Sequence, residues 1–114
     1  FRDDPEVLKI AESERDDIKK IPYRVHAHFQ NKTGFYAFTC NRTIPLKFFG
    51  WHNMQNLSAA LEACLAAGIS ADGFYDAIGS FGGTSGRLQV IRENDSGVFY
   101  YDFAHSPSKV KVAC

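Results

Sequence analysis

The strongest constraint on the fold is a change of hydrophobic period at Pro22, followed by a second change at Gly50. Residues 23–30 alternate between apolar and polar side chains, which is the pattern of a half-buried β-strand. After Gly50 the apolar residues return at helical spacing and share one face of a helix predicted over 53–67: Leu57, Leu61, Cys64 and Leu65. The sequence therefore predicts an α+β fold in which short antiparallel strands precede helices.

Three strand-like segments follow one another with polar turns between them, over 23–30, 35–40 and 44–49. Turns this short connect antiparallel neighbours, so we expect a three-stranded meander. Pro45 lies in the third segment and has no N–H to donate to a ladder, which predicts an edge position for that strand.

Helices are expected on both sides of the meander. Asp4 and Pro5 predict the start of an amphipathic surface helix over 5–20. Gly68 is expected as the C′ residue of the helix over 53–67. Ser70 then begins a second short helix, which packs against the first through Phe74, Ile78 and Phe81.

The C-terminal part of the sequence predicts a β-hairpin and one more helix start. The hairpin strands are expected over 87–92 and 98–103, around the turn residues Asp95-Ser96-Gly97. Ser106 and Pro107 then have the residue types of an N-cap and a first helical position. A helix that begins so near residue 114, in a chain that begins with Phe1, suggests a piece of a longer protein.

Composition limits the classes of partner. The chain has 114 residues, of which 45% are hydrophobic, so it can build a core. Its 13 basic and 13 acidic residues cancel, so charge gives no reason to expect nucleic acid or an anionic membrane as a partner. No stretch approaches the roughly 20 apolar residues that cross a bilayer. The three cysteines match no zinc spacing and predict reduced thiols in a cytoplasmic protein.

Two motifs can each be interpreted either as a structural feature or as a binding site. His26 and His28 lie two apart on one strand, where they form a polar, solvent-exposed face or, with a third ligand, a metal site. The glycine-rich segment 82–86 offers backbone N–H groups that can cradle phosphate, although a flexible connector is the simpler interpretation. Arg87 follows it directly, and a guanidinium binds phosphate oxygens in a bidentate way.

Two further motifs combine polar side chains at the ends of elements. His52, Asn53 and Asn56 begin the helix, and the two amides lie on the same side because they are three residues apart. An amide offers the donor and the acceptor that a purine edge requires, although Asn53 can also act simply as a cap. Asp102 and His105 follow a strand and precede a helix start, a common ligand position in α/β sheets; turn formation and capping are the alternatives.

In their order along the chain, these motifs resemble the Mur ligase family of ATP-dependent peptidoglycan enzymes. They are His52-Asn53-x-x-Asn56-Leu57-x-Ala59-Ala60, Phe81-x-Gly83-x-x-Gly86-Arg87-Leu88-Gln89 and Asp102-Phe103-Ala104-His105-Ser106-Pro107. The resemblance is specific over about residues 44–114, whereas residues 1–43 agree in layout alone. It is greatest to the branches that join a murein peptide or L-alanine to UDP-N-acetylmuramate.

The resemblance implies a parent enzyme that uses ATP and magnesium to form an amide through an acyl phosphate. It places residues 1–97 at the end of the central ATP-binding domain, and residues 98–114 in the hinge and the start of the C-terminal domain. A stand-alone binding module and a folylpolyglutamate or cyanophycin type of ligase remain as alternatives.

The resemblance also implies roles for six residues. Asn53 and Asn56 contact adenine with His52 beside them, Arg87 reaches the ATP phosphates, Asp102 holds the ribose, and His105 lies near the nucleotide. The family's phosphate-binding loop and magnesium ligands are not among the 114 residues, so we expect no catalytic residue here and no ligase or ATPase activity from the chain alone. Gln89 stands where many members have Glu, and Ser106 where relatives often have His or Thr.

Overall fold

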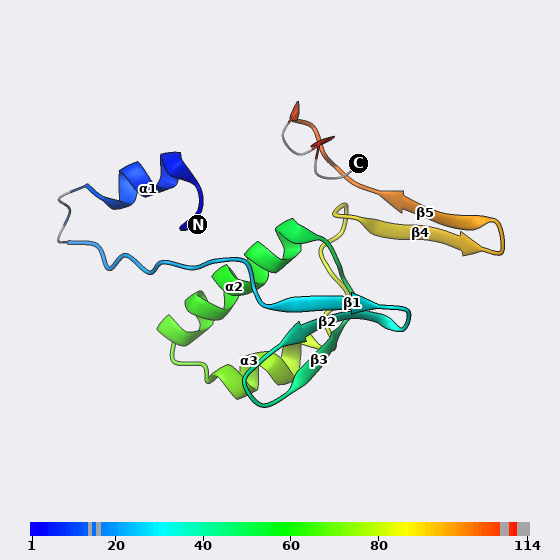
Figure 1. The fold of residues 1–114 in the computed structure, drawn as a ribbon, viewed down its shortest axis with the longest axis horizontal. Helices are drawn as coiled ribbons and strands as arrows, with labels where there is room; N and C mark the ends of the chain where they lie inside the picture. Colours follow the sequence, from blue (N-terminus) through cyan, green and yellow to red (C-terminus); the bar gives the residue numbers. More distant parts are fainter. Residues whose placement is uncertain (14, 16, 108–109, 112–114) are drawn as a thin grey trace.

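The computed structural model describes residues 1–13, 15, 17–107 and 110–111, and the fold of these residues is α+β (Figure 1). The helices are α1 (Pro5–Ala11), α2 (Trp51–Ala66) and α3 (Ala71–Ile78). The strands are β1 (His28–Asn31), β2 (Gly34–Phe38), β3 (Thr43–Leu46), β4 (Gln89–Asn94) and β5 (Gly97–Tyr101). This arrangement confirms the predicted meander, helix pair and hairpin.

The three-stranded sheet has the order β1-β2-β3, and both pairs are antiparallel. Ala37 in the central strand pairs with His28 on one side and with Ile44 on the other. Pro45 of β3 pairs with Tyr36 of β2. Strand β3 lies at the edge of the sheet, as predicted. The missing N–H of proline therefore interrupts no second ladder.

The hydrophobic core lies between this sheet and the helices α2 and α3. Seven hydrophobic side chains are buried there: Ala37, Ile44, Leu46, Phe48, Met54, Leu57 and Phe74. Met54 is fully buried. The predicted helix face included Leu57 but not Met54, and Leu65 on that face is 42% exposed. The buried stripe of α2 therefore begins one turn earlier than the sequence indicated.

The connection between α2 and α3 is the one that the sequence predicts. Gly68 has a left-handed φ of +84°, and its N–H donates to the carbonyl of Leu65 (3.0 Å). The Ile69 N–H donates to the carbonyl of Cys64 (2.9 Å), which completes a Schellman motif. The Ser70 hydroxyl caps α3 by accepting from the Gly73 N–H (3.1 Å). Phe81, expected on the buried face of α3, is 44% exposed because α3 ends at Ile78.

The N-terminal helix is shorter than predicted. Asp4 caps it as expected, accepting from the N–H groups of Glu6 and Val7, but the helix ends at Ala11 instead of residue 20. Residues 14 and 16 lie outside the described residues. No residue of α1 is buried. An amphipathic helix without a packed face has little to stabilise turns beyond the two that are present, since isolated short helices are marginal in water.

The first strand is also shorter than predicted, because the chain changes partner at Ala27. Phe38 N–H still donates to the Ala27 carbonyl (2.9 Å), but one residue earlier the His26 N–H donates to the carbonyl of Met54 in α2 (3.2 Å). The chain therefore passes from β2 to the helix between Ala27 and His26. At the other end of the chain the predicted helix start is present, since the Val110 N–H donates to the Ser106 carbonyl (2.9 Å); residues 108–109 and 112–114 lie outside the described residues.

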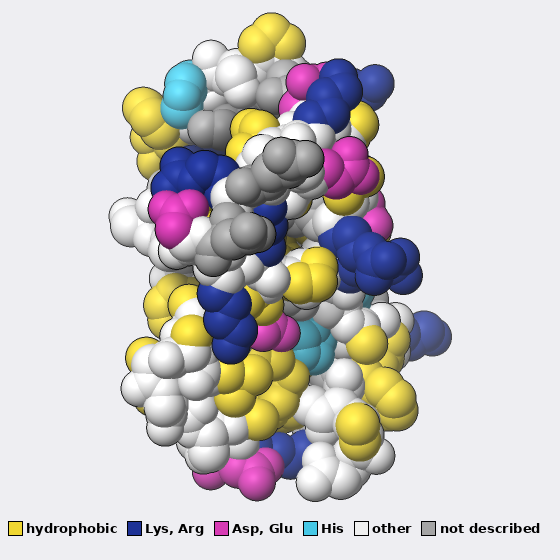
Figure 2. Space-filling model, turned by 90° about the vertical axis from the view of Figure 1, so that its left-hand side faces the viewer, with side chains coloured by type: hydrophobic (Ala, Val, Ile, Leu, Met, Phe, Trp, Pro, Cys, Tyr) yellow, Lys and Arg dark blue, Asp and Glu magenta, His cyan; other side chains and the backbone are white. Residues whose placement is uncertain are grey.

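The described chain is elongated, with extents of 55 × 37 × 21 Å and a radius of gyration of 16.2 Å. A compact domain of this length has a radius of about 13 Å. Figure 1 shows the reason: α1 and the β4–β5 hairpin extend away from the body that α2, α3 and the three-stranded sheet form. Figure 2 shows hydrophobic side chains gathered over the lower half of one face, where that body lies, and mixed basic and acidic side chains above it.

Candidate nucleotide-binding site

The first two turns of α2 carry three of the predicted site residues. The helix begins at Trp51, two residues earlier than predicted, so His52 and Asn53 are its second and third residues. The His52 Nδ1 lies 2.8 Å from the Gln55 Oε1, and both His52 and Asn56 are exposed. The i, i+3 spacing keeps Asn53 and Asn56 on one side of the helix.

Asn53 does not cap the helix. The N-cap is Gly50, with a left-handed φ of +95° and no side-chain cap. The Asn53 Nδ2 instead donates to the Phe49 carbonyl (2.7 Å), so its amide ties the helix to the segment before it. This bond uses one amide hydrogen and leaves the amide oxygen available as an acceptor.

A second group of residues lies where the loop after α3 meets the end of β5. The Asp102 Oδ2 accepts from the Leu88 N–H (2.9 Å), and the Phe103 N–H donates to the Gly86 carbonyl (2.8 Å). Leu88 has a φ of +43°, and it is the only non-glycine residue with positive φ among the described residues. A left-handed leucine costs about 1–2 kcal/mol, so these bonds hold a conformation that the residue itself disfavours.

Contacts connect this loop to the start of α2. A Cβ built on Gly50 would lie 3.1 Å from the Leu88 Cδ1, so Leu88 packs against the residue that begins the helix. The Phe49 and Tyr100 rings meet edge to face with centroids 5.3 Å apart. The structure therefore brings the helix start and the Asp102 segment side by side, although no hydrogen bond joins the predicted site residues directly among the described residues.

Arg87 and His105 lie at the exposed margin of this group. Arg87 is exposed, and its backbone N–H donates to the Thr84 carbonyl (3.2 Å). The His105 Nδ1 lies 3.1 Å from the Phe103 carbonyl, and its ring contacts the Phe103 ring with centroids 5.1 Å apart. The guanidinium of Arg87 and the Nε2 of His105 thus remain available to an incoming ligand.

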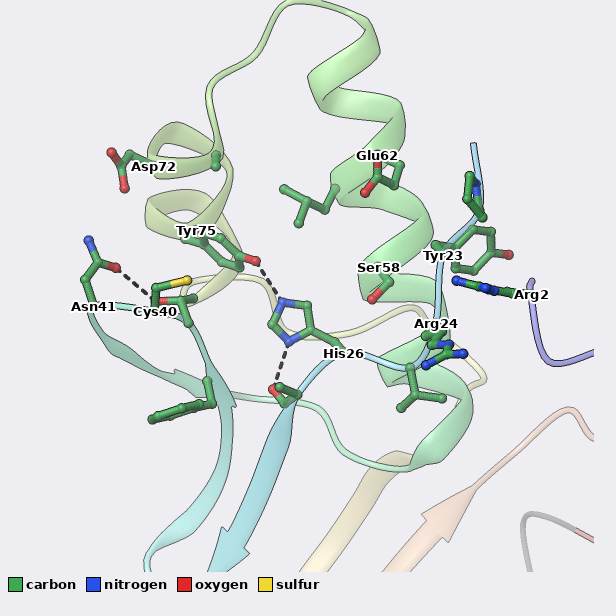
Figure 3. Close-up of a pocket in the computed structure, with 17 residues that line it drawn as sticks. Arg2, Tyr23, Arg24, His26, Cys40, Asn41, Ser58, Glu62, Asp72 and Tyr75 are labelled. Carbon is green, nitrogen blue, oxygen red and sulfur yellow. Dashed lines mark hydrogen bonds between the residues drawn. The ribbon is translucent and has the colours of Figure 1, made fainter. Parts of the chain in front are cut away.

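A separate hollow of about 860 Å³ lies between α2, α3 and the segment 22–27, and it contains none of the six predicted residues (Figure 3). At its centre the Nε2 of His26 lies 2.8 Å from the Tyr75 hydroxyl, and its Nδ1 lies 2.8 Å from the Ala27 carbonyl. His26 is 9% exposed. The expectation of a solvent-exposed face is therefore wrong for His26, although it holds for His28.

The pair of His26 and Tyr75 is explained by packing. The carbonyl of Ala27 can only accept, so the Nδ1 of His26 donates to it; in the neutral imidazole the Nε2 then accepts from the Tyr75 hydroxyl. Burial raises the pKa of Tyr75 above its ordinary value; Cys40 and Glu62 act in the same direction, and Arg42 opposes them. Both ring nitrogens of His26 are satisfied within the protein, so the pair stabilises the fold.

The described residues include no group of three or more His, Cys, Asp or Glu side chains that could hold a metal ion. Nor does the part of the chain in view contain a helix of the length and apolar character that a membrane crossing requires. The six predicted residues offer two amides, one carboxylate, one guanidinium and two imidazoles near the start of α2.

The fold of the described residues occurs in a solved peptide ligase. The fold matches a pseudomurein peptide ligase type C from Methanothermus fervidus with a TM-score of 0.58 and 23% identity, over 88% of this chain and 21% of that one. No family model matches the chain.

The relatives found among curated proteins are Mur ligases. The UDP-N-acetylmuramate–L-alanine ligase of Caldicellulosiruptor saccharolyticus is 30% identical over 122 aligned positions, which cover 96% of this chain and 27% of that ligase. The ligase of the same name from Cytophaga hutchinsonii is 35% identical over 68% of this chain and 16% of its own length. The UDP-N-acetylmuramoylalanine–D-glutamate ligase of Staphylococcus aureus is 34% identical over 82% of this chain and 22% of its own length. The chain is thus a Mur ligase homologue that spans about a fifth of its relatives' length.

Proposed function

We propose that this chain is part of an ATP-dependent Mur-type ligase of peptidoglycan synthesis or recycling. The observation that carries the proposal is the similarity to a UDP-N-acetylmuramate–L-alanine ligase over 96% of the chain. The parent would join UDP-N-acetylmuramate to L-alanine or to a murein peptide through an acyl phosphate. Residues 1–97 would close its central ATP-binding domain, and residues 98–114 would form the hinge and the start of the next domain.

Within that parent, the chain would supply the adenosine side of the nucleotide site. The amides of Asn53 and Asn56 would recognise the adenine edge, with His52 beside them. Their position on one side of α2, whose N-cap Gly50 lies against Leu88 in the loop that Asp102 holds, supports this assignment. Asp102 would accept from the ribose hydroxyls with the carboxylate oxygen that Leu88 does not use.

The phosphate chain would meet the other two residues. Arg87 is exposed beside Asp102, and a guanidinium pairs well with phosphate oxygens. His105 would lie near the nucleotide from the hinge side. Magnesium would be held mainly by parts of the parent outside this chain, as the resemblance to the Mur ligases implies. The residues present would therefore bind and orient ATP without transferring its phosphate.

An AMP titration followed by amide chemical shifts tests the half-site. We expect a Kd on the order of 1 mM, which corresponds to about 4 kcal/mol of binding free energy. The shifts should map to Asn53, Asn56 and Asp102. Asn56→Ala is the first variant, because the side chain is exposed and alanine favours the helix; it should weaken AMP binding severalfold without a loss of stability.

Gln30→Ala is the matched control, since it removes an exposed amide from β1, away from the site. It should bind AMP as the unaltered chain does. Shifts scattered over the surface, or equal loss of binding in the two variants, would contradict the half-site. The pure chain should not turn ATP over. Turnover that Arg87→Ala abolishes would show that the catalytic groups are present after all.

A further inference from the structure

The side chain of Gln89 hydrogen-bonds to two residues of the glycine-rich segment 82–86. Its Oε1 accepts from the Gly86 N–H (3.0 Å) and lies 3.4 Å from the Ser85 hydroxyl, which donates to it. Gly86 is buried and has a left-handed φ of +74°, and a Cβ there would lie 3.5 Å from the Tyr101 ring. The side chain of Gln89 therefore fixes the residue directly before Arg87.

The residue directly after Arg87 is fixed as well. The Leu88 N–H donates to Asp102, and the Gly86 carbonyl accepts from Phe103. Arg87 thus lies between two clamped neighbours, although its own side chain is exposed. A guanidinium on a fixed backbone loses less conformational entropy when it binds an anion than one on a mobile loop.

We propose that Gln89 is a positioning residue for Arg87, and that its neutral amide orders the loop without a negative charge beside the phosphate chain. The inference rests on the proposed function, because it takes the phosphates of ATP as the ligand of Arg87. Both groups that contact Oε1 are donors, so a glutamate would keep both bonds. The two residues would differ in charge, and that charge would act directly on a bound triphosphate.

The first test needs no ligand. Hydrogen exchange of the Gly86 amide should be about tenfold faster in Gln89→Ala, because the amide loses the acceptor that holds it. Gln89→Glu should keep the exchange of Gly86 slow. Gln30→Ala, an exposed glutamine in β1, should leave it unchanged. An unchanged exchange rate of the Gly86 amide in Gln89→Ala would show that the Gln89 side chain does not hold the loop.

The second test compares ATP with AMP by chemical-shift titration in the same variants, without added magnesium. The unaltered chain should bind ATP about tenfold more tightly than AMP, and Arg87→Ala should remove that difference. Gln89→Ala should remove most of it, with the AMP affinity unchanged. Gln89→Glu should weaken ATP binding at low salt and approach the unaltered chain as salt rises, since screening shortens from about 10 Å at 0.1 M to about 3 Å at 1 M.

The outcomes separate the two proposals. Normal AMP binding with no preference for ATP, or with a preference that Gln89→Ala leaves intact, would overturn this inference and leave the adenosine half-site in place. The absence of AMP binding would overturn the half-site and this inference with it. A Gln89→Glu variant that binds ATP more weakly than the unaltered chain by the same factor at every salt concentration would contradict the electrostatic part, because screening should shrink that difference.

Discussion

Met54 is the fully buried large side chain at the centre of the core, and Met54→Ala should destabilise the chain by about 3 kcal/mol. The substitution removes three heavy atoms from a side chain that is 0% exposed. At about 0.8 kcal/mol for each buried methylene-sized group, the lost transfer free energy is about 2.4 kcal/mol. A cavity of up to about 70 Å³ would add about 1.7 kcal/mol if nothing collapsed into it, at about 24 cal/mol per Å³. Partial collapse places the total near 3 kcal/mol, within the range known for such changes.

Urea unfolding followed by far-ultraviolet circular dichroism measures this cost. Leu65→Ala is the matched control, because Leu65 lies on the same helix but is 42% exposed, so its loss should cost less than about 1 kcal/mol. Both substitutions introduce alanine, so helix propensity changes little between them. Equal midpoints for the two variants, or a Met54→Ala cost below about 1 kcal/mol, would refute the position of the core between α2 and the sheet.

Three further predictions concern a helix end, a buried pair and the site loop. Gly68→Ala should cost about 1 kcal/mol in thermal denaturation because φ is +84° with open space around the Cβ, and Gly68→Asn should recover part of it; a neutral alanine would contradict the left-handed cap. The free energy of unfolding should fall as pH rises above about 10, because the phenol of Tyr75 ionises more easily in the unfolded chain than in the folded one, where burial raises its pKa. Tyr75→Phe should make that alkaline fall shallower and should lower stability near pH 7 by about 1 kcal/mol through the lost bond to His26; an identical alkaline slope would show that Tyr75 ionises as it does in solution. Asp102→Ala should speed hydrogen exchange of the Leu88 amide by about tenfold or more, and Asp102→Asn should have an intermediate effect because it keeps an acceptor. Equal protection of the Leu88 amide in the unaltered chain and both variants would show that Asp102 does not hold this loop.

The elements with local signals are those that the sequence could predict. The meander follows from alternation and from turn residues a few positions apart, and the edge position of Pro45 follows from its missing N–H. The boundary between α2 and α3 follows from Gly68 and Ser70, whose chemistry acts within a few residues. Such signals need no knowledge of the rest of the chain.

The features that were missed depend on distant parts of the chain. The helix predicted over 5–20 ends at Ala11 because no surface packs against its apolar stripe, which the stripe itself cannot reveal. His26 follows the alternation, which predicts an exposed face for it. It is buried because the chain leaves β2 at Ala27 and runs along α2, and because Tyr75 of α3, 49 residues away, contacts its ring.

The candidate site combines both cases. The spacing of Asn53 and Asn56 fixes their common side on α2, so their relation is readable from the sequence. The position of Arg87 is not, because it depends on a bond between Leu88 and a residue 14 positions later. A leucine with positive φ contradicts its own propensity, and conformations of this kind persist only where the surroundings hold them, often at functional sites. The same bond that opposes this strain occupies one oxygen of Asp102, so loop geometry and ribose recognition would be coupled through a single carboxylate.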